Sequence, residues 1–277
     1  MWHYLKSSPT EPDTRKQDDP THWLWGGASH RGGRDEQQDR WGVFVPPERQ
    51  GLLAVVADGL GGHGDGALGA QAVIDATEHF LHQQTTLLCH CPAEALSLLC
   101  EYAQNRITQV SKLAHSTIIV LWLSGGQAHW MHVGDSRLYQ LRRGVRLLRT
   151  RDHSAAQLLL DMGEIDEAEL ATHPEQSRLY RSLGGAEFPR PELGSSGVEV
   201  TDLFVLCSDG VWEHIQESEF WEAAMRFQDL TRAATLLVEL AATRGGSQAD
   251  NATLVLIRSG KQRGAGWHWL RCLFGGK

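Results

Sequence analysis

The stretch from Leu52 to His63 constrains the fold more than any other part of this sequence. Six apolar residues, 52–57, run directly into Asp58 and the glycine-rich loop Gly59-Leu60-Gly61-Gly62. A run that is apolar on both faces and bounded by glycine is typical of an interior strand. The sequence therefore predicts a buried β-strand that delivers a carboxylate to the edge of a core.

Two further acids follow the same pattern. The apolar run 203–207 leads into Ser208-Asp209-Gly210, and Asp250-Asn251 lies just before the apolar run 253–257. A single Asp-Gly pair is often an ordinary turn, because aspartate caps its own backbone and glycine adopts a positive φ. Three acids at the ends of predicted strands favour one shared site.

Length, composition and charge narrow the class of protein. The chain has 277 residues with 41% hydrophobic content, which suffices for a sizeable core, and its net charge of −8 argues against nucleic acid as the main partner. No apolar run approaches the roughly 18 residues of a membrane span, and the N-terminus lacks a signal peptide's apolar core. Five cysteines without framework spacing favour free thiols. We expect a cytoplasmic protein that is a monomer.

The order of predicted elements indicates the fold class. Strands 41–45 and 52–57 are expected to form a hairpin, and helical spacing of apolar residues follows the glycine loop and Pro92. A meander of three strands is predicted at 117–123, 128–133 and 138–141, with Asp135 at its second bend. A helix capped by Asp229 and a last strand at 253–258 complete the pattern. Hairpin strands with helices grouped between them predict an α+β sandwich.

The glycine loop has a competing interpretation. Gly59 to Gly64 matches the dinucleotide pattern G-x-G-x-x-G, so a nicotinamide-dependent oxidoreductase is the remote alternative. However, Asp58 would repel a pyrophosphate, and no Gly-Lys-Ser/Thr of a P-loop follows. Acids beside glycines suit hard cations such as Mg²⁺ or Mn²⁺, to which Gly59 could add its backbone carbonyl.

Taken in order, these residues resemble the metal-dependent protein phosphatases of type 2C (the PPM family), especially their bacterial members. The resemblance spans about residues 26–258. It rests on six motifs in the family's order, which are Arg34-x-x-Gln37-Gln38-Asp39, Asp58-Gly59-Leu60-Gly61-Gly62-His63, Gly134-Asp135-Ser136-Arg137, Asp152-His153-Ser154, Ser208-Asp209-Gly210 and Asp250-Asn251.

The resemblance implies a four-layer α-β-β-α sandwich of two antiparallel sheets, with a dinuclear Mn²⁺ or Mg²⁺ centre at one end. Asp58 resembles the bridging ligand, with the Gly59 carbonyl on one metal and Asp209 and Asp250 on the other. Asp39 would order metal-associated water. Asp135 and Asp209 match positions that hold a third, weaker ion in bacterial relatives.

Other site residues also follow from the resemblance. Arg34 matches the arginine that binds the substrate phosphate, and His63 either protonates the leaving group or braces the loop. Residues 155–190 fall where the family has a flap beside the cleft. Gln38 is a departure, because the family often has glutamate there and a neutral amide is a weaker ligand for a hard cation. A phosphoprotein-binding pseudophosphatase, weak or inactive in catalysis, is therefore the alternative to an active enzyme.

The resulting division has a flexible arm at 1–22, a type 2C catalytic domain at 23–258 and a basic, aromatic tail at 259–277. The implied reaction is hydrolysis of phosphoserine and phosphothreonine in proteins, opposing a serine/threonine kinase. The substrate would be a phosphorylated protein, such as that kinase or its targets. The tail is expected to pack back onto the domain in preference to contacting an anionic membrane.

Overall fold

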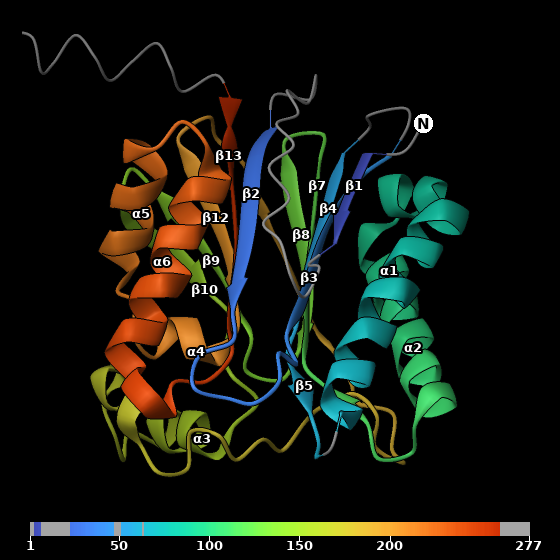
Figure 1. Ribbon diagram of the computed structural model, residues 1–277. Helices are drawn as coiled ribbons and strands as arrows, with labels where there is room; N and C mark the ends of the chain where they lie inside the picture. Colours follow the sequence, from blue (N-terminus) through green and yellow to red (C-terminus); the bar gives the residue numbers. More distant parts are fainter. Residues whose placement is uncertain (1–2, 7–22, 47–50, 63, 261–277) are drawn as a thin grey trace, which may run out of the picture.

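The computed structural model of the protein describes residues 3–6, 23–46, 51–62 and 64–260. Two antiparallel sheets pack face to face, and helices cover the outer face of each sheet (Figure 1). Helices α1 (Asp65–His90) and α2 (Pro92–Val110) lie on one side, and α5 (Glu217–Arg226) and α6 (Leu230–Gly245) lie on the other. The predicted four-layer sandwich is confirmed.

Every strand pairing within the described residues is antiparallel. The first sheet has the order β1 (His3–Lys6), β3 (Arg40–Val45), β4 (Leu52–Ala57), β7 (Ile118–Ser124), β8 (Gln127–Val133) and β11 (Glu192–Gly197). The second has the order β10 (Val145–Arg149), β9 (Arg137–Arg142), β12 (Asp202–Cys207), β13 (Ala252–Ser259) and β2 (Trp23–His30). A short ladder joins β5 (Gly59–Leu60) to β6 (His115–Ser116).

Residues at the helix ends explain where two of the helices begin. Pro92 opens α2, a position at which its missing N–H costs nothing. The Asp229 carboxylate accepts a hydrogen bond from the Thr231 N–H at 3.0 Å and caps α6, as predicted. The shorter helical elements are α3 (Ala155–Met162), α4 (Asp209–Trp212) and two 3₁₀ turns, Glu167–Thr172 and Gly246–Gln248.

The sandwich explains why β4 is apolar on both faces. Side chains of a strand alternate between the two faces, and here both faces are covered. Leu53, Val55 and Ala57 belong to the core beneath α1 and α2, whereas Leu52, Ala54 and Val56 belong to the core between the two sheets. A third core lies between the second sheet and α4 to α6. The strand that carries Asp58 is therefore held from both sides.

Two interpretations of the sequence are wrong. The meander was expected to continue from 128–133 into 138–141, but β8 pairs with β7 and β11 while β9 pairs with β10 and β12 in the other sheet. The chain crosses between sheets at Gly134 to Ser136. The dinucleotide alternative also fails, because it requires a parallel βαβ unit and β4 pairs antiparallel with both neighbours.

The chain ends and the predicted insertion differ in how far they are described. Within the predicted arm, His3–Lys6 pair with β3, while residues 7–22 and the tail beyond Gly260 lie outside the described residues. The segment 155–190 contains α3 and a 3₁₀ turn, and it returns through bridges between Ser154 and Leu179 and between Ser116 and Leu183. None of the described helices is long and apolar enough to cross a bilayer.

Candidate active site

Strand register gathers the five predicted acids at one end of the sandwich. Asp58, Asp135 and Asp209 follow β4, β8 and β12, whereas Asp39 and Asp250 precede β3 and β13. In antiparallel sheets the start of one strand lies beside the end of its neighbour. Arg40 of β3 pairs with Ala57 of β4. Asp39 and Asp58 are the next residues beyond this pair, so both acids lie at the same end of the two strands.

Asp58 and Asp209 lie within the repulsive field of the other acids. Burial raises the pKa of Asp58 well above its ordinary value, and the charges of Asp39 and Asp209 raise it further. Burial likewise raises the pKa of Asp209, with added repulsion from Asp135. The backbone of Asp58 is fixed by Thr117, whose Oγ1 lies 3.0 Å from the Asp58 nitrogen and whose N–H donates to the Asp58 carbonyl at 2.8 Å.

Asp39 and Asp135 each keep one carboxylate oxygen without a partner among the described residues. Asp39 is 1% exposed and accepts from Ser208 Oγ at 2.7 Å, but its Oδ1 has no hydrogen bond; Asp135, 3% exposed, leaves its Oδ1 unpaired as well. Burial raises the pKa of both carboxyl groups to about 7, with Asp250 adding repulsion at the first and Asp152 at the second. The Oδ1 atoms of Asp39 and Asp135 are therefore available to bind a cation.

Asp250 and Arg34 meet at the more exposed side of the cluster. Arg34 Nη2 donates to Asp250 Oδ2 at 2.6 Å, with 59% and 34% of the two side chains exposed. The hydrogen bond and charge of Asp250 raise the pKa of the guanidinium. The next residue, Asn251, holds the loop that carries Arg34, since its side chain accepts from the Gln38 N–H and donates to the Arg31 and Glu36 carbonyls.

The glycine loop packs directly against the start of α1. A Cβ on Gly59 would lie 2.0 Å from the Gly66 carbonyl oxygen and 2.9 Å from that of Gln38, so that no larger residue fits. The Gln38 amide donates weakly to Glu36 Oε2 at 3.3 Å and to the Gly61 carbonyl at 3.4 Å. His63 lies outside the described residues.

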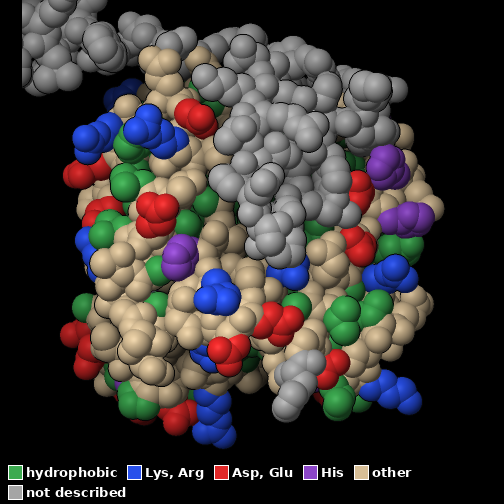
Figure 2. Space-filling view, viewed as in Figure 1, with side chains coloured by type: hydrophobic (Ala, Val, Ile, Leu, Met, Phe, Trp, Pro, Cys, Tyr) green, Lys and Arg blue, Asp and Glu red, His purple; other side chains and the backbone are tan. Residues whose placement is uncertain are grey.

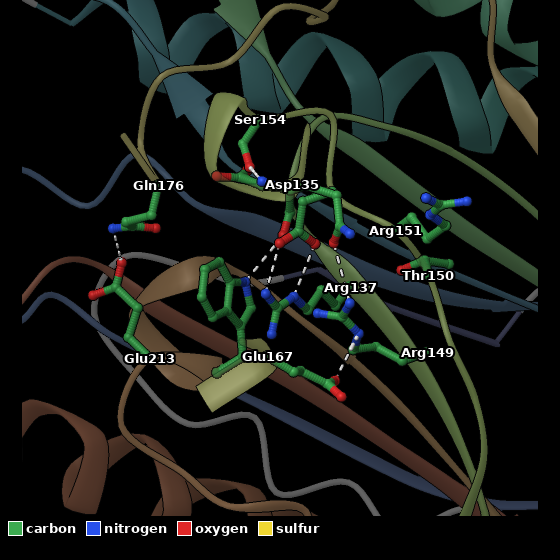
Figure 3. Close-up of polar contacts among 12 residues, drawn as sticks. Asp135, Arg137, Arg149, Thr150, Arg151, Ser154, Glu167, Gln176 and Glu213 are labelled. Carbon is green, nitrogen blue, oxygen red and sulfur yellow. Dashed lines mark hydrogen bonds and ion pairs between the residues drawn. The ribbon is translucent and has the colours of Figure 1, made fainter. Parts of the chain in front are cut away.

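Sequence reasoning missed Glu213, a sixth acid at this end. It lies four residues after Asp209, where a helical turn places both side chains on one face. Its charge contributes to the raised pKa values of Asp135 and Asp209, and burial raises its own pKa. Gln176, from the segment 155–190, donates to its Oε1 (Figure 3). The i, i+4 spacing was the available signal.

A buried ion pair between Arg137 and Asp152 supports the loop that carries Asp135. Arg137 donates from Nε and Nη2 to the two oxygens of Asp152 at 2.8 and 2.6 Å, and its guanidinium lies 3.5 Å from the Trp212 ring centroid (Figure 3). Trp212 Nε1 in turn donates to the Asp135 carbonyl at 3.0 Å. These contacts hold the crossing loop, residues 134–136, where the chain passes from one sheet to the other, against α4.

The donor set fits divalent cations that prefer oxygen. Several carboxylates share a small volume, two of them have unpaired buried oxygens, and their mutual repulsion is only partly offset by Arg34, Arg40 and Arg137. On the face shown in Figure 2, acidic and basic side chains are interspersed at this end of the molecule. The fold and this cluster together define an α-β-β-α sandwich with an acidic site at one end that suits divalent cations.

Comparison with known proteins gives the family. The sequence profile of the family "Protein phosphatase 2C" matches residues 26–242. The chain therefore belongs to the protein phosphatase 2C family.

Two bacterial phosphatases, one of them also as a solved structure, are similar to the chain. The serine/threonine protein phosphatase PstP of Mycobacterium tuberculosis H37Rv is 31% identical over 207 residues, which cover 74% of this chain but only 40% of PstP. The serine/threonine phosphatase stp of Listeria innocua is 29% identical over 237 residues, covering 81% of this chain and 90% of stp. A crystal structure of the PstP catalytic domain with two manganese ions superposes with a TM-score of 0.70, at 26% identity, covering 85% of this chain and 97% of that domain.

Proposed function

We propose that this protein hydrolyses phosphoserine and phosphothreonine in phosphorylated proteins at a dinuclear Mn²⁺ or Mg²⁺ centre. The observation that carries the proposal is the convergence of Asp39, Asp58, Asp135, Asp209 and Asp250 at one end of the sandwich, with buried oxygens left unpaired. Membership of the phosphatase family and the manganese-bound relative support it.

The proposed ligands divide between the two sides of the cluster. Asp58 would serve both ions, the Gly59 carbonyl one of them, and Asp209 and Asp250 the other. Asp135 and Asp209 would hold a third ion, with Glu213 as a further oxygen donor because its charge acts on both. Gln38 would be a weak or indirect ligand. When bound, such ions acidify water for in-line attack and neutralise charge on the transferred phosphoryl group.

The remaining polar side chains position the reactants. The Arg34 guanidinium, now bound to Asp250, would offer its planar fork to the phosphoryl oxygens once cations compensate the carboxylate. Asp39 would accept a hydrogen bond from a water molecule through Oδ1, while Ser208 holds its other oxygen. For His63 the two roles predicted from the sequence remain open to test.

The biological setting is part of the proposal. The protein would act as a cytoplasmic monomer that opposes a serine/threonine kinase, with the kinase or its targets as substrates. The segment 155–190 would form a flap beside the cleft, since Gln176 reaches Glu213 from it.

The test is hydrolysis of a phosphothreonine peptide by the purified chain with Mn²⁺, with Mg²⁺ and with EDTA. We expect phosphate release that depends on the divalent cation and is lost in EDTA. Binding of the phosphopeptide without release under every metal condition would instead support the pseudophosphatase alternative. Release that is unaffected by EDTA would refute the metal centre.

A further inference from the structure

One buried histidine joins three parts of the molecule and has no role in the proposed chemistry. His153 is 2% exposed and follows Asp152 in the loop between β10 and α3. It contacts the crossing loop at Gly134, the returning arm of the segment 155–190 at Tyr180, and the edge strand β11 at Glu192. No other described residue bonds to both polar backbone atoms of Gly134.

The two bonds to Gly134 form a clamp. The His153 N–H donates to the Gly134 carbonyl at 2.9 Å, and the Gly134 N–H donates to His153 Nδ1 at 3.1 Å. Gly134 has a φ of +106°, and a Cβ there would lie 2.6 Å from Thr117 Cγ2, so this backbone conformation requires glycine. The clamp fixes the residue directly before Asp135.

The clamp also determines the state of the imidazole. Because the Gly134 N–H donates to Nδ1, the clamp requires the tautomer of a neutral imidazole that carries its proton on Nε2, facing Glu192 Oε2 at 3.7 Å. Arg181 Nη1, 3.3 Å from Nε2, is only a donor and would bond to this nitrogen in the other tautomer, so its contact competes with the clamp. The ring stacks on His132 with centroids 4.6 Å apart and planes 10° from parallel. His132 Nε2 lies 2.8 Å from the Arg151 carbonyl, so this nitrogen carries the proton of His132.

The geometry disfavours a metal ion shared by His132, His153 and Glu192, although their ligand atoms lie within 4.8 Å of one another. The lone pair of an imidazole nitrogen lies in the ring plane, and two nearly parallel planes do not converge on one ion. In addition, the free lone pair of His153 is already used by Gly134. A shared ion would require ring rotation and loss of the clamp.

The same histidine fastens the segment 155–190. The Tyr180 N–H donates to the His153 carbonyl at 3.0 Å, the Tyr180 ring packs on the imidazole with centroids 5.7 Å apart, and the Ala155 N–H donates to the Arg178 carbonyl at 2.9 Å. A second anchor lies further along, where the Gln104 side chain bonds the backbones of Gly184 and Gly185, each at 2.7 Å. Gln104 has no hydrogen bond to Gly134.

We propose that His153 is a positioning residue that transmits the docking of the segment 155–190 to Asp135 through its clamp on Gly134. The inference rests on the proposed function, because it assigns Asp135 to a cation. Loss of the clamp would leave a buried N–H and carbonyl of Gly134 to reorganise, and Asp135 would move with them. Cation affinity at Asp135 would then fall without any change in its ligands.

The test compares two substitutions of His153 whose side-chain amides differ in length. In His153→Asn, Oδ1 replaces Nδ1 as the acceptor for the Gly134 N–H, whereas in His153→Gln the amide extends toward the position of Nε2 and the acceptor is lost. Gln104→Leu is the matched control, since it removes two hydrogen bonds from the same segment without touching Gly134. Mn²⁺ binding is measured by calorimetry, and exchange of backbone amides around Gly134 by deuterium labelling.

We expect His153→Gln to weaken the weakest Mn²⁺ site about tenfold and to speed exchange around Gly134, the size expected for about one lost buried hydrogen bond. His153→Asn should stay within about twofold of the wild type, and Gln104→Leu should lower the melting temperature without changing Mn²⁺ affinity. Equal Mn²⁺ affinities in the Asn and Gln variants, or an equal loss in Gln104→Leu, would overturn the proposal.

Two further results separate this inference from the proposed function. Failure of the wild type to hydrolyse phosphopeptide would refute the function but leave the calorimetric comparison intact. Stabilisation of the wild type by Zn²⁺ that disappears in His153→Asn would identify a metal site at the stacked histidines, and would overturn the positioning role.

Discussion

Two kinds of buried acid lie side by side at the same end of this molecule, and they differ in whether the protein supplies them with a partner. Asp152 has both oxygens bonded to Arg137, whose guanidinium is covered by Trp212. Asp39 and Asp135 are equally buried, yet each keeps an unpaired oxygen. A buried carboxylate is costly unless it is paired, so that Asp39 and Asp135 are stabilised either by a proton or by a cation from outside the chain. The comparison distinguishes an acid that holds the structure from acids held ready for cations.

The largest expected effect is the loss of turnover in Asp209→Asn. Because Asp209 is assigned to the catalytic ions, hydrolysis of a phosphothreonine peptide should fall by roughly 10³-fold or more while the protein stays folded. Asp229→Asn is the control, since it also removes a carboxylate but keeps a good helix cap. Turnover of Asp209→Asn within tenfold of the control would contradict the assignment.

Asp152→Asn should mainly reduce the stability of the fold. It removes the carboxylate that is paired directly with the buried Arg137, so the free energy of unfolding should fall by about 3–5 kcal/mol in guanidinium titrations. Saturating Mn²⁺ should not restore this loss to the variant, whereas it should stabilise the wild type. A decrease below about 1 kcal/mol would remove the distinction between the two groups.

The stability of the metal-free protein should depend on pH because of the unpaired acids. The pKa of Asp39 and of Asp135 is raised to about 7 in the folded state, above the ordinary value of 3.8, so the folded state binds more protons between these values. This contribution is therefore fully present below about pH 4 and is lost as the pH rises through about 7, by on the order of a few kcal/mol. Melting curves in EDTA from pH 5 to 8 measure it, and Asp39→Asn should flatten the slope. A slope that is the same in that variant would argue against the assignment.

Arg34→Ala tests the exposed pair. The KM for a phosphothreonine peptide should rise about tenfold through loss of a charged hydrogen-bond donor, with a smaller rise for an activated aryl phosphate that makes fewer contacts. The neighbouring Arg31→Ala, also exposed, serves as the control. An unchanged KM for both substrates would exclude a phosphate-binding role for Arg34.

The smallest effect is expected at Gln38. Gln38→Glu supplies an anionic oxygen beside the glycine loop, so half-maximal activity should require several-fold less Mn²⁺. Gln37→Glu at the adjacent position is the comparison variant. A Mn²⁺ titration curve that does not shift would place Gln38 outside the ligand set.

The sequence predicted the layers and the acid-bearing strands because those features are local. An apolar run such as 52–57 predicts a buried strand from its own residues, and Asp229 predicts the start of the helix that it caps. The placement of β9 could not be predicted, since the turn at Gly134 to Ser136 has the residues of a hairpin and only the packing of two sheets directs it across. Glu213 was missed for a related reason: α4 is a single turn, too short for apolar periodicity to show.

The acids of the site come from positions between Asp39 and Asp250, and neither sheet holds them all. Contacts between residues so distant along a chain form late, because loop-closure entropy must be overcome before they become favourable. β13, the last strand, lies between β12 and β2 and carries Asp250 at its start. During synthesis, the chain would therefore gain its complete metal centre only after nearly all of the domain has been made, and recovery of activity during refolding should report the slowest step of assembly.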